Sequence, residues 1–426
     1  MTTVASSVRE QAETAEASSR LLARLSTAAR TNALLSLADL IERETGPVLE
    51  ANVADIKAAR EAGVDAYFIE RLTLNEERLR GIAAETRTVA GLPDPVGEVF
   101  DSRMLPNGLL IGRRRVPLGL VACIYESRPN VTVDIASLSL KSGNACILRG
   151  GKEAQRSNNA LADLIARALA QSEVPPEAVQ VIREPDRAHV DELLAMNEVI
   201  DLIVPRGGAG LLAHVRENAT MPVVAAGVAV VHVYVDEYAD MDMAEEILDN
   251  SKMRRYSICN ALDTIILHRS VAAEALARLS RRWGGEVTLL GDERALEILS
   301  GQPESTISAE PAKPEDWHTE LLSLRACVKI VDTMDGALAH IESVDSGHSE
   351  AIVTENYGNA MRFLDEVDAA AVYVNASTQF TDGAQFGLGA EIGISTQKMH
   401  ARGPMGLKEL TSYKWTVFGR GQVRPG

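Results

Sequence analysis

The apolar residues of the first fifth of the chain recur every three or four positions. Leu21, Leu25 and Ala28 follow this spacing, which continues over residues 10–85. A period of 3.6 residues places apolar side chains on one face of an α-helix. We therefore expect the chain to open with a run of helices.

Turn-forming residues then interrupt the helical spacing. Pro93 and Pro95 end the pattern, and residues 104–116 alternate like two short strands around a Pro-Asn-Gly turn at 106–108. Asn-Gly between alternating strands is a strong signal for a tight hairpin turn. We expect a projecting hairpin that ends in the basic run 113–115.

The central part of the chain alternates continuous apolar runs with helical patterns. Strands that are apolar throughout and are separated by helices are typical of a parallel sheet covered on both faces. The pattern therefore predicts a doubly wound α/β domain. Its expected strands are 119–125, 144–148, 179–183 and 199–204, and its expected helices are 131–141 and 157–170.

The same alternation restarts after Cys259 and predicts a second α/β domain. A tail rich in glycine and turns, residues 379–426, follows it and carries one further strand at 413–418. At 426 residues the chain is long enough for two or three domains, each with its own core. The expected strands of the second domain are 262–267, 327–331, 350–353 and 371–374, and its expected helices are 271–283 and 357–367.

The charge of the chain narrows the classes of partner. The formal net charge is −17 at pH 7, and so acidic a surface repels nucleic-acid phosphates and anionic lipid headgroups. We therefore expect no nucleic acid and no membrane partner. An anionic small-molecule substrate stays compatible with this charge where basic side chains gather locally.

Cysteine and histidine usage argues for a reducing compartment and against a catalytic metal. The four cysteines lack metal-ligand spacing, and a chain of this length does not need disulfides. The polar first twenty residues do not have the form of a signal peptide, so we expect a cytoplasmic protein. The chain has no HExxH pair and no G-x-S-x-G elbow. His348 and His400 are expected to be ordinary surface residues in turns.

Cys259 is the first candidate for chemistry. It lies between the two predicted α/β domains, a usual place for a substrate cleft, and it follows the basic residues Lys252, Arg254 and Arg255. Positive charge nearby favours the reactive thiolate. A buried structural thiol is an equally good interpretation of an isolated cysteine, so the pattern alone leaves both readings open.

Asn130 follows the first strand of the predicted parallel sheet. The carboxyl ends of such strands line the ligand crevice of open α/β folds, where an amide could donate to a developing oxyanion. Asparagine is also a good N-cap for the helix expected from residue 131. From these residues alone we favour the cap.

Basic residues and glycines follow two other strands. Arg149 and Lys152 flank a Gly-Gly pair, which would let the backbone approach a phosphate such as an adenosine 2′-phosphate. A solvated charged loop is the more ordinary interpretation. Residues 208–213 match the dinucleotide pattern G-x-G-x-x-A. This match is weak because it comes late in the sheet and the acidic pair 236–237 lies further on than the pattern requires.

Several long motifs resemble one enzyme family. They make the chain similar, over nearly its whole length, to the γ-glutamyl phosphate reductase family of the aldehyde dehydrogenase superfamily. The resemblance implies an aldehyde dehydrogenase-like α/β fold, with a Rossmann-type cofactor domain, a second α/β catalytic domain and an oligomerisation arm. The motifs are the segments 116–132, 143–154, 205–208 and 393–406, and the residues around Cys259 and Asn260.

The same resemblance implies a division of the chain into three parts. Residues 1–103 and 117–255 would form the cofactor-binding domain, and residues 256–399 the catalytic domain. Residues 104–116 and 400–426 would form the oligomerisation arm. A homodimer or a higher homo-oligomer is then expected.

Catalytic and cofactor roles also follow from the resemblance. It implies that Cys259 is the nucleophile and that Asn130 and the backbone N–H of Cys259 form the oxyanion hole. Arg149 would approach the adenosine ribose, and Lys152 would favour NADPH over NADH. The remaining positions implied at the cofactor are Gly207 and Gly208.

Two arginines are candidates for the anionic ends of the substrate. The resemblance implies a substrate with a phosphate and an α-carboxylate, and Arg128 and Arg402 are the hypotheses for these groups. A structural salt bridge is an equally good interpretation of either side chain.

The reaction implied by the resemblance is the NADPH-dependent reduction of L-glutamyl 5-phosphate to L-glutamate 5-semialdehyde in proline biosynthesis, with release of phosphate. Association with the glutamate 5-kinase that supplies the substrate is a further expectation. Hydrolytic members of the superfamily carry a glutamate base where segment 225–228 stands here, and this segment holds no carboxylate. We therefore expect a thioester at Cys259 to be reduced and not hydrolysed. The alternatives are an acyl-CoA reductase of the same fold and a non-catalytic protein in which Cys259 is inert.

Overall fold

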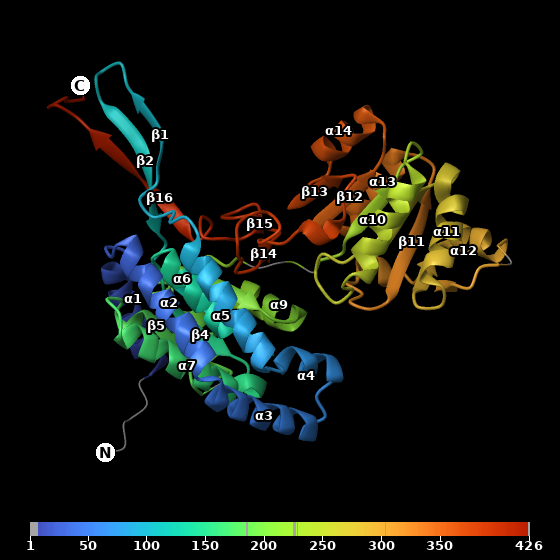
Figure 1. Cartoon of the computed structure of the whole chain (residues 1–426). Helices are drawn as coiled ribbons and strands as arrows, with labels where there is room; N and C mark the ends of the chain where they lie inside the picture. Colours follow the sequence, from blue (N-terminus) through green and yellow to red (C-terminus); the bar gives the residue numbers. More distant parts are fainter. Residues whose placement is uncertain (1–6, 185, 225–226, 228, 303, 425–426) are drawn as a thin grey trace. The chain divides into compact units, whose positions relative to one another are not determined.

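The structure is a computed structural model in which residues 7–184, 186–224, 227, 229–302 and 304–424 are described (Figure 1). The chain forms two compact units. The first consists of residues 1–225, 387–393 and 405–426, and the second of residues 226–386 and 394–404.

The first unit opens with helices, as the spacing of apolar residues predicts. Ser7 begins the first of them with a capping box, because its Oγ accepts from the Glu10 backbone N–H at 3.2 Å while the Glu10 carboxylate accepts from the Ser7 N–H at 3.0 Å. The prediction of an all-helical opening is confirmed. The helices are α1 (Val8–Leu22), α2 (Thr27–Arg43), α3 (Thr45–Glu61), α4 (Ala66–Leu72) and α5 (Glu76–Gly91).

A four-stranded parallel sheet follows, in the order β5-β4-β3-β6. Every residue of β3 and β4 is buried, which explains why these strands read as continuous apolar runs. The prediction of a parallel α/β sheet is confirmed. The strands are β3 (Leu120–Tyr125), β4 (Ala145–Gly150), β5 (Val179–Val181) and β6 (Leu202–Arg206), and the helices are α6 (Val131–Lys141), α7 (Gln155–Ala170), α8 (Ala188–Leu194) and α9 (Ala209–Asn218).

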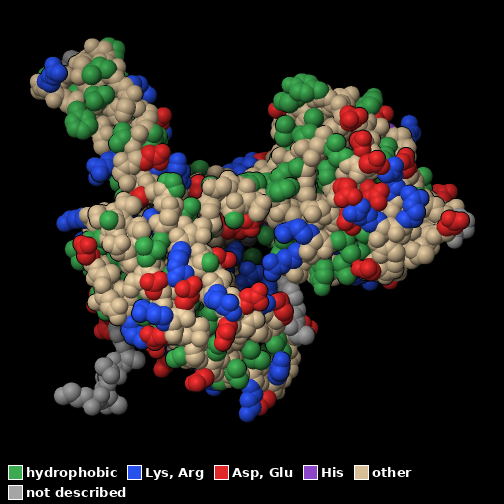
Figure 2. Space-filling view, viewed as in Figure 1, with side chains coloured by type: hydrophobic (Ala, Val, Ile, Leu, Met, Phe, Trp, Pro, Cys, Tyr) green, Lys and Arg blue, Asp and Glu red, His purple; other side chains and the backbone are tan. Residues whose placement is uncertain are grey.

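An antiparallel arm projects from the first unit (Figure 1). It consists of β1 (Val99–Met104), β2 (Leu110–Pro117) and β16 (Thr411–Phe418) in the order β1-β2-β16. The predicted hairpin and the predicted last strand are therefore confirmed, with β1 beginning five residues before the expected start. Apolar side chains remain exposed along the arm (Figure 2), among them Val99, Met104, Trp415, Val417 and Phe418.

The second unit is built on a seven-stranded parallel sheet in the order β10-β9-β11-β8-β7-β12-β13. Helices α10, α11 and α12 contribute to the apolar core on one face and α13 and α14 to that on the other. The strands are β7 (His232–Val235), β8 (Thr264–His268), β9 (Thr288–Gly291), β10 (Ser308–Pro311), β11 (Arg325–Val331), β12 (Ser349–Val353) and β13 (Ala371–Val374). The helices are α10 (Met241–Met253), α11 (Arg269–Trp283), α12 (Glu293–Ser300), α13 (Met334–Val344) and α14 (Tyr357–Glu366).

The division between the units differs from the boundary expected after residue 255. The structure divides the chain after residue 225, because the four-residue strand β7 pairs in parallel with both β8 and β12. Helix α10 follows β7 and packs on the same sheet. Residues 232–253 therefore belong with the seven-stranded sheet.

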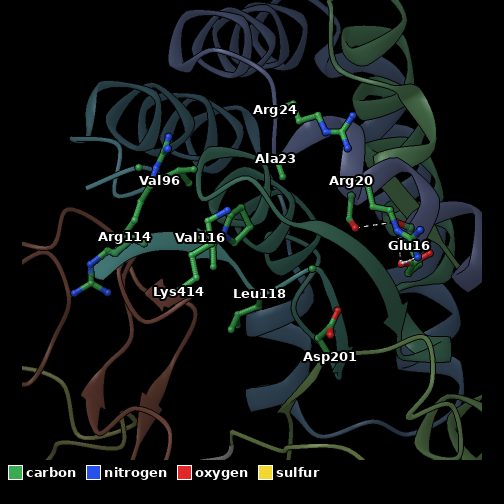
Figure 3. Close-up of a pocket in the computed structure, with 15 residues that line it drawn as sticks. Glu16, Arg20, Ala23, Arg24, Val96, Arg114, Val116, Leu118, Asp201 and Lys414 are labelled. Atoms are coloured by element: carbon green, nitrogen blue, oxygen red, sulfur yellow. Dashed lines mark hydrogen bonds and ion pairs between the residues drawn. The ribbon is translucent and has the colours of Figure 1, made fainter. Parts of the chain in front are cut away.

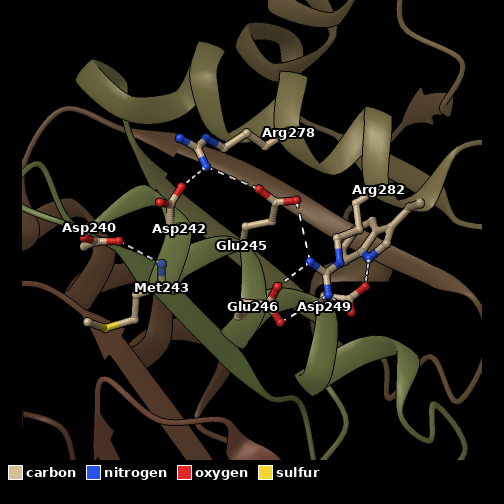
Figure 4. Close-up of polar contacts among 9 residues, drawn as sticks. Asp240, Asp242, Met243, Glu245, Glu246, Asp249, Arg278 and Arg282 are labelled. Carbon is tan, nitrogen blue, oxygen red and sulfur yellow. Dashed lines mark hydrogen bonds and ion pairs between the residues drawn. The ribbon is translucent and has the colours of Figure 1, made fainter.

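Helices α10 and α11 are joined by a network of ion pairs (Figure 4). Arg278 lies 2.5 Å from Asp242, and Arg282 lies 2.5 Å from Glu246 and 2.9 Å from Asp249. Single exposed pairs of this kind contribute about 0–1 kcal/mol each. The apolar face between the helices, and not the network, therefore dominates their packing.

The expectation that His348 is a surface residue is wrong. Its side chain is fully buried directly before β12, an inner strand of the seven-stranded sheet. Its Nδ1 lies 2.8 Å from the Ser349 Oγ, and burial lowers the pKa of His348 to about 4. His400, in contrast, is exposed as expected.

Among the described residues, no helix has the length and apolar composition needed to cross a membrane.

The buried amide of Asn52 provides a test of the packing of the helical opening. Its Nδ2 donates to the Leu72 carbonyl at 2.8 Å and to the Ser157 Oγ at 3.1 Å, and its Oδ1 accepts from the Leu74 N–H at 2.8 Å. We expect Asn52→Ala to lower the free energy of unfolding by about 1–3 kcal/mol, because it leaves buried partners unsatisfied. Urea denaturation measures this loss.

Asn32→Ala is the matched control, because Asn32 is exposed on α2. It should change the free energy of unfolding by no more than about 0.5 kcal/mol. Equal losses in the two variants would contradict the structural role of the Asn52 amide.

Candidate functional site

Three loops of the first unit leave the parallel sheet at the same edge. Tyr125, the last residue of β3, lies in register with Gly150 of β4 and with Arg206 of β6. The segments after these strands therefore lie close together at the carboxyl edge, which is where open α/β sheets bind ligands. They carry most of the predicted site residues of this unit.

A carboxylate from the second loop holds the first. The Glu153 Oε1 accepts from the Ser127 backbone N–H at 2.6 Å and from the Ser127 Oγ at 2.9 Å. Ser127 has a φ of +48°, a conformation that a non-glycine residue rarely adopts without support from its surroundings. Glu153 therefore stabilises the turn that leads to Arg128 and Asn130.

The third loop contacts the same turn through Glu126. The Gly208 N–H donates to the Glu126 Oε2 at 3.0 Å. A Cβ atom at Gly207 would lie 2.4 Å from the Glu126 Oε2, whereas Gly208 and Gly210 have open space around theirs. A side chain at Gly207 would therefore have to displace the end of the Glu126 side chain. The G-x-G-x-x-A segment begins with Gly208 at the strand-to-helix turn after β6 and continues into α9.

Asn130 does not cap helix α6, so the interpretation favoured from its local sequence is wrong. Its backbone already has helical dihedral angles, φ −56° and ψ −33°, and its side chain makes no capping hydrogen bond. The Asn130 Nδ2 instead donates to the Asp134 Oδ2 at 2.8 Å. The amide is thus oriented by a carboxylate one turn further along the helix.

Asp134 occupies an unusual electrostatic environment. Burial, and next the nearby Glu85, raise the pKa of the Asp134 carboxyl to about 7, against the opposing effects of the Asn130 hydrogen bond and the charges of Arg206 and Arg128. A carboxyl that titrates near neutral pH beside a candidate catalytic amide is a feature typical of functional sites. The sequence offered no signal for it beyond its spacing of four residues from Asn130.

The two basic residues at the end of β4 and just after it differ in their surroundings. The Arg149 side chain is only 8% exposed, donates to the Asp186 carbonyl at 3.0 Å, and has its pKa lowered by burial. Arg149 is therefore not a solvated charge. Lys152 is exposed at the start of a short 3₁₀ turn, so its ammonium is accessible from the sheet edge.

Cys259 lies in the second unit, in the turn between α10 and β8. Its side chain is half-buried, whereas Cys123, Cys146 and Cys327 are fully buried. Burial raises the pKa of each of these three thiols to about 12. Cys259 is thus the cysteine whose exposure suits reaction with a ligand.

The turn that carries Cys259 is held by a segment that the sequence reasoning missed. The buried Asn260 Nδ2 donates to the carbonyls of Gln379 and Thr381, at 3.3 and 3.0 Å, and the Thr378 Oγ1 donates to the Asn260 carbonyl at 2.8 Å. The Gln379 Nε2 also donates to the Ser251 carbonyl at 2.9 Å. The signal available in the sequence was the polar stretch directly after the predicted strand 371–374.

Two of the basic residues before Cys259 have structural partners. Lys252 is fully buried, donates to the Leu262 carbonyl at 2.8 Å, and has its pKa lowered to about 8 by desolvation despite the nearby Asp263. Arg254 donates to the Gln379 Oε1 at 2.7 Å. Both side chains therefore brace the turn in which Cys259 lies.

Arg402 takes part in a salt bridge, one of its two predicted roles. Its Nη1 lies 2.6 Å from the Asp368 Oδ1, and Lys398 pairs with the same carboxylate. Arg128 is half-buried in the loop after β3.

The segment 225–228, which holds no glutamate, lies outside the described residues except for Gly227.

A basic cavity of about 540 Å³ lies elsewhere in the first unit, between α1 and the base of the arm (Figure 3). None of the predicted site residues lines it, so we assign the chemistry to the loops and not to this cavity. The charged residues that line the cavity are Glu16, Arg20, Arg24, Arg114, Arg115, Asp201 and Lys414.

In the described part of the chain, no group of three or more His, Cys, Asp or Glu side chains is placed to hold a metal ion.

Comparisons with known proteins agree on one family. The model of the aldehyde dehydrogenase family matches residues 2–293. A gamma-glutamyl phosphate reductase of Dehalococcoides mccartyi is 53% identical over 420 residues, covering 98% of each chain, and one of Roseiflexus castenholzii is 51% identical over 413 residues, 96% of this chain and 97% of the relative. The crystal structure of gamma-glutamyl phosphate reductase from Thermotoga maritima superposes with a TM-score of 0.93 at 45% identity, covering 99% of this chain and all of that one.

The exposure of the four thiols predicts selective alkylation. Iodoacetamide should modify Cys259 first in the native chain, because the other three thiols are buried and their pKa values are raised to about 12. Peptide mass spectrometry should find one adduct per chain, and Cys259→Ser should abolish it. Modification of Cys123, Cys146 or Cys327 at the same rate in the folded chain would contradict this assignment.

Proposed function

Because the chain belongs to the aldehyde dehydrogenase family, and within it to the γ-glutamyl phosphate reductases, we propose that it reduces L-glutamyl 5-phosphate to L-glutamate 5-semialdehyde and releases phosphate. The single observation that carries the proposal is Cys259, a half-buried thiol on a braced turn in a chain whose other cysteines are buried. Relatives at about half identity over the whole chain bear the name of this reductase.

The first half of the proposed reaction belongs to Cys259. Its thiolate attacks the acyl carbon of the substrate, forming a C–S bond, and the C–O bond to phosphate then breaks. The tetrahedral oxyanion that forms on the way is stabilised by the Asn130 amide and the backbone N–H of Cys259. The product of this half is a thioester on Cys259 and free phosphate.

The second half reduces that thioester. NADPH, when bound, supplies the hydride for this step. The Asn130 amide and the Cys259 N–H stabilise the second oxyanion, and the C–S bond then breaks to release the aldehyde and the thiolate. A water-activating carboxylate would divert the thioester to glutamate, and segment 225–228 has none.

The loops at the carboxyl edge of the first sheet fit a nicotinamide dinucleotide. We assign Arg149 to the adenosine ribose and the accessible Lys152 to a 2′-phosphate, which favours NADPH over NADH. Gly207 and Gly208 stand at the start of α9, and Gly208 has open space where a backbone can approach a ligand. These glycines complete the proposed cofactor site, which contains no metal.

For the substrate, Arg128 is the stronger candidate for binding an anionic group, because it lies two residues from Asn130. Arg402 is less suited to this role, since Asp368 already balances its charge at 2.6 Å. We therefore assign Arg128 to the phosphate or the α-carboxylate of the substrate. Arg402 has a structural role, the salt bridge to Asp368.

The arm supports a homo-oligomer. Val99, Met104 and Phe418 are 58%, 64% and 66% exposed on a three-stranded sheet, and exposed apolar side chains in such number favour burial against a second copy of the chain. We accordingly propose the arm as the oligomerisation element, the first unit as the cofactor domain and the second as the catalytic domain. Association with glutamate 5-kinase stays a prediction from the family resemblance.

The reverse reaction tests the proposed function. Given glutamate semialdehyde and NADP⁺, the native chain should form NADPH only when inorganic phosphate is present. Cys259→Ser should lower the rate by at least about 10⁴-fold, because the serine hydroxyl is a far weaker nucleophile. Cys146→Ala is the control, since Cys146 is buried in β4, and it should keep most of the activity.

Two outcomes would contradict the proposed function. Activity that survives Cys259→Ser would exclude the cysteine mechanism. Activity that depends on coenzyme A in place of phosphate would assign the chain to another reaction of the same family.

The choice of cofactor rests on Lys152. We expect Lys152→Ala to lower kcat/KM for NADPH about tenfold, the equivalent of ~1.4 kcal/mol for one charge-assisted contact, and to leave kcat/KM for NADH unchanged. Lys57→Ala is the matched control, because Lys57 is an exposed lysine of α3 in the same unit. Equal losses of kcat/KM with NADPH and with NADH would show that Lys152 does not bind the 2′-phosphate.

A further inference from the structure

We propose that Asp134 is a positioning residue, whose carboxylate orients the Asn130 amide for its work in the oxyanion hole. The inference rests on the proposed function, since it deepens the role of an amide that this function uses. Asp134 itself touches neither substrate nor cofactor in this proposal. It acts through Asn130.

The geometry of the pair carries the proposal. The Asn130 Nδ2 donates to the Asp134 Oδ2 at 2.8 Å, and the Asn130 side chain makes no hydrogen bond to the start of α6. An ionised carboxylate accepts hydrogen bonds and cannot donate them, so it selects the amide orientation in which Nδ2 faces Asp134. One N–H of this nitrogen is then occupied, and the direction of the other is set.

The charges around Asp134 come from three other segments. Glu85 of α5 opposes its ionisation, while Arg128 of the loop after β3 and Arg206 at the end of β6 favour it. Burial is the largest effect, and it raises the pKa of Asp134 to about 7. The carboxylate is therefore kept in an environment that does not suit its charged form.

This environment indicates that the carboxylate does not serve stability. Because the pKa in the folded chain lies above its ordinary value near 3.8, the ionised group destabilises the fold above pH 7, and stability rises as the pH falls from 7 towards 4. An uncharged side chain of the same shape would suit the fold better. A residue that lowers stability at a candidate site is the pattern expected of a group retained for function.

The test combines activity with thermal stability in a double-mutant cycle. In the phosphate-dependent reverse reaction, Asp134→Ala should lower kcat about tenfold or more, with the KM for NADP⁺ and for phosphate changed less than about twofold. Asn130→Ala should lower kcat by about 10²–10³. Adding Asp134→Ala to Asn130→Ala should lower kcat no further, because a residue that acts through the amide has no effect once the amide is gone.

Asp134→Asn keeps the shape of the side chain and separates function from folding. It should lower kcat, since an amide can face Asn130 in either orientation, while the Tm stays the same or rises. The rise should be larger at pH 8 than at pH 5, because the native carboxyl is ionised only at the higher pH. Glu76→Gln, which removes an exposed acidic group from the first turn of α5, should leave kcat unchanged.

Three results would overturn the proposal. The first is an unchanged kcat in Asp134→Ala. The second is a kcat in the double variant that is lower than in Asn130→Ala by the same factor as Asp134→Ala lowers it alone. The third is a fall in Tm for Asp134→Asn that accounts for its lost activity. If the native chain shows no phosphate-dependent activity at all, the proposed function fails and this inference fails with it. An active native chain with an unaffected Asp134→Ala variant overturns this inference alone.

Discussion

The site of the first unit depends on the parallel pairing of β3 with both β4 and β6. Because the three strands end in register, at Tyr125, Gly150 and Arg206, the loops after them meet at one edge of the sheet. A shift in either pairing would separate Asn130 from the loops that carry Lys152 and Gly207. The contacts between the loops then convert this proximity into a defined arrangement.

Carboxylates make those contacts in the first unit. Glu153 supports the positive φ of Ser127, and Glu126 accepts from the Gly208 N–H. Within the segment after β3, Asp134 accepts from Asn130. A chain with a net charge of −17 thus uses some of its acidic groups to shape the loops that we assign to anionic ligands. The basic side chains Arg149, at the end of β4, and Lys152, just after it, supply the attraction.

In the second unit, main-chain carbonyls and amide side chains hold the turn that carries Cys259. Hydrogen bonds of Asn260 and Gln379 join the Cys259 turn and the end of α10 to the segment after β13. The buried Lys252 adds a contact to the Leu262 carbonyl. The turn is therefore held on both sides of Cys259, which suits the proposed role of Cys259 as a nucleophile that meets its substrate in one geometry.

Much of this architecture could be predicted from the sequence, because strands buried on both faces read as unbroken apolar runs. Strand β7 was not predicted, and its place in the second unit follows from its parallel pairing with β8 and β12. The role of Asn130 could not be decided locally, since an asparagine before a helix caps it or not according to its own dihedral angles. His348 was misplaced for a different reason, because its burial is decided by the neighbouring strands of the sheet, which are distant in the sequence.

The central claim is that a thioester forms on Cys259 and is protected from water. In the reverse reaction, this thioester is passed on to phosphate. Mass spectrometry of the native chain, incubated with glutamate semialdehyde and NADP⁺ but without phosphate, tests it most directly. The account predicts an acyl adduct on the Cys259 peptide that hydroxylamine removes, that persists in buffer, and that disappears when phosphate is added. An adduct that decays to glutamate in buffer alone, or no adduct on Cys259, would contradict it.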